Sequence, residues 1–162
     1  MIRKGVKSDL PQVLELIKEL ATYERAPDEV TNTLEKMEDD GFGPQPCYGL
    51  FVAEEEGKIV GISIYYTRYS TWKGRMLYLE DIVITESRRG KGIGSALFEA
   101  TGREAIRGGY DGMVWQVLDW NEPAIKFYEK YKAELDGEWV NGKLRVERLR
   151  ELFDRPYRSN TL

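Results

Sequence analysis

The chain has 162 residues, 41% of them hydrophobic and 32% charged, which is ordinary for one globular domain with a single core. Its net charge of −4 argues against nucleic-acid binding and suits a cationic partner. It contains no histidine and a single cysteine, which excludes a His-based triad and an internal disulfide framework and predicts a cytoplasmic protein without a metal. No stretch approaches the ~20 apolar residues that span a bilayer, so no membrane association is expected.

The first half of the chain predicts a strand, two helices and an antiparallel meander. A strand at 2–6 precedes a helix that begins near Ser8 and runs to about residue 24, with apolar residues at helical spacing. A short helix is expected at 31–37, followed by a glycine-rich loop at 40–44. Runs rich in β-branched and aromatic residues predict strands at 48–54, 59–69 and 75–84, joined by turns.

The second half predicts two further helices, one more strand and a late hairpin. A helix is expected from Gly92 to about Arg107, a strand at 112–118, and a helix that Asn121 caps and that ends near Lys132. The Asn-Gly pair at 141–142 predicts the turn of a hairpin over 139–146. The charged tail from about 147 is expected to begin as a helix and to end loosely. This order predicts one α/β domain over 1–162, with a mixed, mostly antiparallel sheet flanked by helices.

The most informative stretch lies between a predicted strand and a predicted helix, at 88–97, and reads RRGKGIGSAL. Free amides at a helix start, the helix dipole and close backbone approach at glycine make such a junction a site for an anion. It matches neither the dinucleotide fingerprint nor the P-loop, because the required glycine, Ser or Thr positions hold other residues. A flexible glycine turn is the structural alternative.

The pattern Arg89-x-x-Gly92-x-Gly94 at this junction resembles motif A of the GNAT superfamily of acyl-CoA-dependent N-acyltransferases. The order of elements resembles that fold from end to end. The similarity is closer to the spermidine/spermine (diamine) N-acetyltransferase branch, which includes thialysine acetyltransferases. The segments that carry it are LATYE (20–24), FVAE (51–54), LYLED (77–81), WNEP (120–123) and FY (127–128), together with aromatic residues at 65, 66, 69 and 72.

The resemblance implies acetyl-CoA as cosubstrate and no metal. The backbone from Arg89 to Gly94, with Ser95, would bind the CoA pyrophosphate, and neighbouring cations would assist. The strand edge before this loop would pair with the pantetheine arm and offer an N–H to the acetyl carbonyl, where it would stabilise the oxyanion. The implied cofactor-binding residues are Ile82, Val83, Ile84, Arg88, Arg89, Gly90, Lys91, Gly92, Ile93, Gly94, Ser95, Asn121 and Tyr128.

The chemistry of amine acylation independently requires a base, because an amine of pKa ~10 is protonated at neutral pH. Without histidine, a carboxylate acting through water is the reasonable base, and Glu80 and Asp81 interrupt an apolar run just before the loop. Adjacent strand residues point to opposite faces unless a bulge intervenes. We expect Glu80 to be the base or a substrate contact, and Asp81 to be an ammonium partner. The alternative is that one carboxylate is a solvated strand residue.

Tyr128 follows Asn121 by two helical turns, so both lie on one helix face. Spacing alone favours a packed tyrosine, whereas the resemblance implies that Tyr128 donates a proton to the departing thiolate. In the resembling branch, positions that correspond to Tyr23, Glu24 and Trp72 help to bind the amine; ordinary surface packing is the alternative.

The sequence therefore predicts acetyl transfer to a primary amine of a small cationic substrate, either a diamine or polyamine or a lysine-like amino acid such as thialysine. Acetylation of a peptide or protein amine, and an acyl-CoA-binding regulatory module without turnover, are the alternatives. A homodimer is expected because the C-terminal segment contributes to a dimer in that branch. After residue 133, however, the sequence departs from the resemblance, which leaves the geometry of such a dimer open.

Overall fold

The computed structural model describes residues 1–154, and the chain divides by its internal contacts into two compact units, Met1–Gln116 and Val117–Leu162. The first unit contains the sheet and the helices that pack on it. Its elements are β1 (Ile2–Lys4), η1 (Lys7–Asp9), α1 (Leu10–Tyr23), η2 (Pro27–Glu29), α2 (Leu34–Phe42), β2 (Gly49–Glu55), β3 (Lys58–Ser70), β4 (Gly74–Ile84), η3 (Glu86–Arg88), α3 (Ile93–Arg107) and β5 (Gly112–Trp115). The second unit contains α4 (Glu122–Glu129) and α5 (Val146–Phe153).

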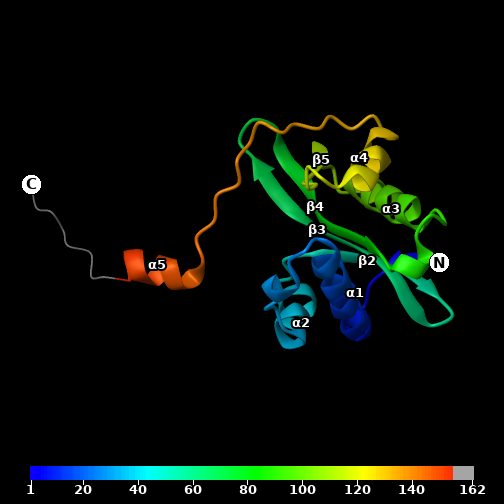
Figure 1. Cartoon of the computed structure of the whole chain (residues 1–162), viewed down its shortest axis with the longest axis horizontal. Helices are drawn as coiled ribbons and strands as arrows, with labels where there is room; N and C mark the ends of the chain where they lie inside the picture. Colours follow the sequence, from blue (N-terminus) through cyan, green and yellow to red (C-terminus); the bar gives the residue numbers. More distant parts are fainter. Residues whose placement is uncertain (155–162) are drawn as a thin grey trace, which may run out of the picture. The chain divides into compact units, whose positions relative to one another are not determined.

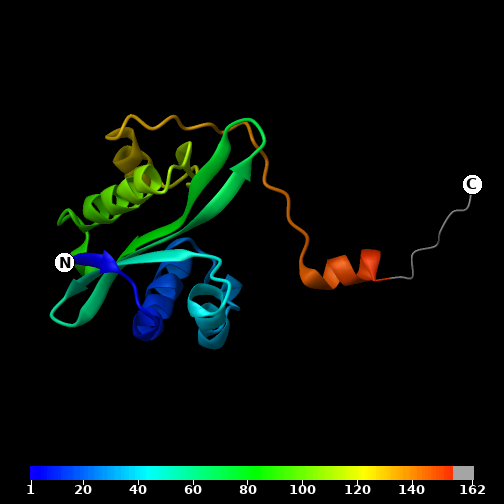
Figure 2. The same ribbon diagram turned by 180° about the vertical axis from the view of Figure 1, so that it is seen from behind.

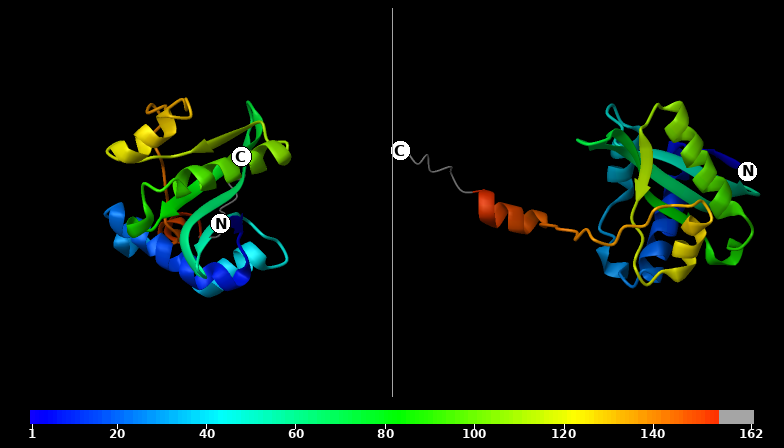
Figure 3. Two further views of the ribbon diagram at one scale, coloured as in Figure 1. Left: turned by 90° about the vertical axis from the view of Figure 1, so that its right-hand side faces the viewer. Right: turned by 90° about the horizontal axis from the view of Figure 1, so that it is seen from above.

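The five strands of the first unit form one sheet in the order β1-β2-β3-β4-β5. The first four strands pair antiparallel, and β5 pairs parallel with β4 after the crossover through α3. Helices α1 and α2 lie on one face of the sheet and α3 lies on the other (Figure 1). The same layering is seen from behind in Figure 2 and from the side and above in Figure 3. The mixed sheet expected from the sequence is confirmed.

Strand alternation explains why the sheet needs helices on both faces. Leu50 and Val52 of β2 join the core under α1 and α2, whereas Phe51 and Ala53 join the core under α3. Such two-sided burial is typical of a sheet that is covered on both faces. The α3 side also buries a polar contact, a 2.6 Å hydrogen bond between the Ser63 and Thr101 hydroxyls.

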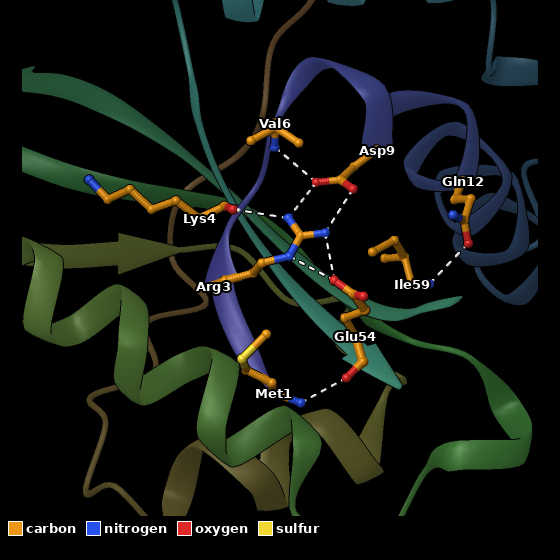
Figure 4. Close-up of polar contacts among 8 residues, drawn as sticks. All are labelled: Met1, Arg3, Lys4, Val6, Asp9, Gln12, Glu54 and Ile59. Atoms are coloured by element: carbon orange, nitrogen blue, oxygen red, sulfur yellow. Dashed lines mark hydrogen bonds and ion pairs between the residues drawn. The ribbon is translucent and has the colours of Figure 1, made fainter. Parts of the chain in front are cut away.

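An ion-pair network ties the first strand to the start of α1 and to β2 (Figure 4). Arg3 donates two hydrogen bonds to the carboxylate of Asp9, at 2.7 and 2.9 Å, and one to Glu54 at 2.8 Å. Asp9 also accepts the amide of Val6 at 2.8 Å. The bonded guanidinium of Arg3 holds the pKa of the Asp9 carboxyl below its usual range, although burial of this carboxyl acts in the opposite direction; the amide of Val6 also lowers it. The network fixes the edge strand against the helix that follows it.

The structure differs from the sequence-based predictions chiefly after residue 133. The hairpin predicted over 139–146 is wrong, since residues 133–145 form no strand in the structure. Trp139 is 77% and Val140 96% exposed, so the two have no apolar face against which a two-stranded ribbon could gain stability. A helix does follow at Val146, where the tail was expected to turn helical, and the end of the tail lies outside the described residues. None of the described helices has the length and apolar character that a membrane span requires.

Candidate functional site

The loop after β4 has the backbone geometry of an anion site. Gly90 and Gly92 adopt positive φ values of 74° and 80°, a left-handed conformation that strains other residues. Gly92 caps α3, and the first bond within the helix runs from the amide of Ala96 to its carbonyl. The amides of residues 93–95 therefore point out of the helix start, where the described residues place no side-chain cap and no acidic residue in the first turn.

The three cations of this loop are held differently. Arg88 donates to Glu55 at 2.7 Å, toward the β2–β3 turn. Arg89 donates to the Ile84 carbonyl at 3.1 Å. Lys91 is exposed, and no contact of its ammonium is recorded within residues 1–154. Arg88 and Arg89 are thus held by contacts within the chain with 42% of each side chain exposed, and the predicted roles of all three cations at the phosphate stay predictions.

The end of β4 presents a free edge next to this loop. Its ladder with β5 covers Met76–Leu79, so the residues from Glu80 onward extend past the β5 register. The amide of Thr85 donates to Val60 of β3, and backbone groups alternate between the two edges of an antiparallel strand. Ile82 and Ile84 consequently present their N–H and C=O groups to the free edge, whereas Val83 directs its own toward β3. Ile82 and Ile84 fit the predicted pairing with an extended arm, and Val83 does not.

A β-bulge brings the two carboxylates of β4 onto one face. The register between β3 and β4 shifts so that Ile64 pairs with Asp81 but Tyr65 pairs with Leu79, which leaves Glu80 as the extra residue. Before the bulge, Leu77 faces the α3 core, so Glu80 lies on the opposite face. After it, Val83 faces the α1 core, and so does Asp81. Both acidic groups therefore lie on the α1 side of the sheet.

Glu24, at the C-terminal end of α1, completes a cluster of three carboxylates with Glu80 and Asp81. Burial, followed by the charges of Glu80 and Glu24, raises the pKa of Asp81 to about 7. Burial also raises the pKa of Glu24. Three neighbouring carboxylates repel one another and lower the stability of the fold. A bound alkylammonium group would neutralise part of this negative charge.

Two tyrosines that were not predicted as site residues lie beside Glu80. The Tyr66 and Tyr78 rings are 5.1 Å apart across β3 and β4. Burial, then the charge of Glu80 and a hydrogen bond with it, raises the pKa of Tyr66 to about 12. Burial and the Glu80 charge also raise the pKa of Tyr78. The spacing from Tyr78 to Glu80, two residues on one strand, is the signal that identifies this neighbour in the sequence.

The remaining predicted substrate residues are placed separately. Tyr23 is 38% exposed and lies under the Arg89 guanidinium, with Cζ 5.1 Å from the ring centroid. Trp72 is 85% exposed in the β3–β4 turn. Glu80 lies six positions after Gly74 along β4, which puts this turn about 20 Å from the carboxylates. The structure thus brings Tyr23 and Glu24 to the site and does not bring Trp72 to it.

In the second unit, α4 carries both residues predicted from the helix-face spacing. Asn121 caps α4 by accepting the amide of Ala124 at 3.4 Å, and it is 9% exposed. Tyr128 is 5% exposed, and its ring meets Phe127 edge-on at 5.2 Å. Their predicted roles in arm binding and proton donation stay predictions.

Known proteins with similar sequences include acetyltransferases. Residues 10–132 match the model of the acetyltransferase (GNAT) family. The chain is 39% identical to a thialysine N-epsilon-acetyltransferase of Bos taurus, covering 94% of this chain and 96% of that one. It is 36% identical to spermidine/spermine N(1)-acetyltransferase-like protein 1 of Homo sapiens, over 78% of this chain and 19% of that protein.

The fold is shared with solved acetyltransferases. The aminoglycoside N-acetyltransferase AAC(6')-Iy, solved in complex with CoA, superposes with a TM-score of 0.68 at 20% identity, covering 90% of this chain and 99% of that chain. Family model, nearly full-length relatives and fold agree, and the chain therefore belongs to the acetyltransferase (GNAT) family as an N-acetyltransferase of the thialysine and spermidine/spermine branch.

Proposed function

We propose that this protein transfers the acetyl group of acetyl-CoA to a primary amine of a small cationic substrate, either a diamine or polyamine or a lysine-like amino acid. The observation that carries the proposal is the cluster of Glu24, Glu80 and Asp81 on one face of the sheet, beside a free strand edge and an anion-binding loop. The cytoplasmic location and homodimer expected from the sequence form part of the same proposal.

The loop and the strand edge suit the two ends of an acyl-CoA. The amides at the start of α3 and the ammonium of Lys91 suit a pyrophosphate. The outward N–H and C=O of Ile82 and the outward N–H of Ile84 suit the amides of a pantetheine arm, which would add to β4 as an extra strand, whereas the Ile84 carbonyl is held by Arg89. An N–H on this edge would hydrogen-bond the acetyl carbonyl and stabilise negative charge on its oxygen during attack.

The carboxylate cluster suits the amine. Three acidic groups attract an alkylammonium, and removal of its proton frees the lone pair that attacks the thioester. We assign this deprotonation to Glu80 through a water molecule, with Asp81 as the ammonium partner. The new C–N bond forms as the C–S bond breaks, and we assign to Tyr128 the proton that the departing thiolate takes up.

The relatives support a small amine rather than a protein substrate. The names of the bovine and human relatives specify thialysine and spermidine or spermine, which are short molecules with primary amines. Glu24 comes from the C-terminal end of α1, and Glu80 and Asp81 come from β4, so all three cluster carboxylates belong to one chain. A single chain thus supplies the charge that a compact cationic substrate requires.

A thiol-release assay tests the proposal. The protein is incubated with acetyl-CoA and, in separate reactions, thialysine, lysine, putrescine, spermidine and a lysine-containing peptide. We expect CoA release with at least one small amine and little release with the peptide. Preferential turnover of the peptide would favour a protein-amine acetyltransferase. Tight CoA binding without release for any amine would favour a binding module.

A further inference from the structure

The carboxylate of Glu19, near the end of α1, makes three contacts with one segment far along the chain. Oε2 accepts the hydroxyl of Thr85 at 3.0 Å, and Oε1 accepts the amide of Glu86 at 2.8 Å. Nη2 of Arg89 lies 3.6 Å from the same Oε1. Glu19 therefore receives a hydroxyl, an amide and a cation from residues 85–89, the five-residue start of the anion-binding loop.

These contacts also determine where the Arg89 side chain lies. Its Nε donates to the Ile84 carbonyl at 3.1 Å, and its Cζ lies 5.1 Å from the centroid of the Tyr23 ring. Glu19 and Tyr23 are one turn apart on α1, so their side chains lie on the same stripe of the helix. Arg89 thus links the free edge of β4 to the end of α1.

The segment held by Glu19 stands directly before the glycines. From Thr85, five residues lead to Gly90 and seven to Gly92, the two left-handed positions that turn the chain into α3. An anion site made of backbone amides binds well only if those amides are already oriented. Because the Glu19 carboxylate binds residues 85–89 to α1, it reduces the conformational freedom of the segment that directly precedes Gly90.

We propose that Glu19 is a positioning residue for the cofactor loop, and that its contacts with Thr85, Glu86 and Arg89 couple this loop to the end of α1 that carries Tyr23 and Glu24. The role rests on the proposed function in that the loop binds acetyl-CoA. It assigns Arg89 to the internal contacts of the protein and leaves the ligand's phosphates to Lys91 and the backbone amides.

The test compares Glu19→Ala and Glu19→Gln with Glu15→Ala in the full chain. Glu15 lies one turn earlier on α1, and its exposed carboxylate pairs only with the nearby Lys18 among the recorded contacts. Three quantities are measured: the Kd of CoA by calorimetry, amide exchange over 84–92, and KM and kcat for acetyl-CoA with the most active amine. The exchange and calorimetry need no turnover.

We expect Glu19→Ala to raise the Kd of CoA about tenfold, the effect of roughly one or two lost hydrogen bonds. Exchange should quicken over 84–92 while the β2 and β3 amides stay protected, and KM for acetyl-CoA should rise with kcat within about threefold. Glu19→Gln, which keeps an acceptor oxygen, should fall between wild type and Glu19→Ala. Glu15→Ala should match wild type.

A Kd within twofold of wild type in Glu19→Ala would overturn the proposal, whatever the change in melting temperature. So would uniformly faster exchange, which indicates a merely structural role. If wild type binds CoA but acetylates no amine, the proposed function fails while the Kd comparison still decides the role of Glu19. If wild type binds no CoA, both fail.

Discussion

Replacement of Asp81 by Asn should make the protein more stable at neutral pH and worse at binding its amine. The folded environment raises the pKa of Asp81 from the ordinary 3.8 to about 7, through burial and then the charges of Glu80 and Glu24. The folded state therefore holds this proton more tightly than the unfolded chain does. Stability from the protonated group is fully present below pH ~4 and is lost as the pH rises through about 7.

The size of the effect follows from the difference between the two pKa values. The folded and unfolded pKa values differ by about 3, and each pKa unit corresponds to ~1.4 kcal/mol. The ionised carboxylate therefore lowers the free energy of unfolding by about 4 kcal/mol above pH 7. Partial solvent access and relaxation reduce this, so we expect a gain of about 2 to 4 kcal/mol for Asp81→Asn at pH 8. The gain should shrink steadily toward pH 5, where the wild-type carboxyl is protonated when folded.

Urea unfolding of wild type and Asp81→Asn at pH 5, 6, 7 and 8 measures this difference, with Asp28→Asn, at an exposed position in η2, as the control. The amine KM at pH 8 should rise about tenfold in Asp81→Asn, since one of three carboxylates is gone. The inference that Asp81 has a raised pKa would be wrong if Asp81→Asn were less stable than wild type at pH 8. It would also be wrong if the difference in free energy of unfolding did not change with pH.

Four further substitutions test other parts of the molecule. Tyr128→Phe should lower kcat about 100-fold with the Kd of CoA within twofold, because only the proton donor is lost; unchanged kcat in steady-state assays would remove its acid role. Lys91→Gln should weaken CoA binding several-fold and reduce the salt dependence of the Kd, whereas Arg88→Gln should leave both nearly unchanged. Calorimetry at two salt concentrations measures both quantities. An equal loss of CoA affinity in the two variants would contradict the different roles given to Lys91 and Arg88. Arg3→Met should cost about 2 to 3 kcal/mol in urea unfolding at pH 7, and less as the pH falls through the lowered pKa of Asp9, since that carboxylate stabilises the fold only when ionised; a pH-independent cost would count against the network.

The order of elements could be predicted from the sequence because its signals are local. Helix α2 begins after its Thr33 cap, α4 begins after its Asn121 cap, and the strands of the meander follow runs of β-branched and aromatic residues. The hairpin predicted at Asn141-Gly142 failed because a turn signal specifies a hairpin only where its strands have a surface to pack on.

The site was only partly predictable, because its decisive features depend on contacts between distant segments. Glu80 and Asp81 were identified by their place in an apolar run, but the bulge that puts them on one face is visible only in the β3–β4 register. The roles of the loop cations could not be told apart either. Glu19 and Arg89 are 70 positions apart in the printed sequence, and no local pattern pairs them.

The most direct test of the central claim follows the acetyl group itself. The protein is incubated with acetyl-CoA labelled with ¹³C in the acetyl group and with thialysine or spermidine, and the reaction is followed by NMR. We expect the label to move from the thioester to an amide on a primary amine, at a rate that falls sharply in Glu80→Gln. If the protein binds CoA and the amine is saturating, but the label stays on CoA, the proposed acetyl transfer is wrong.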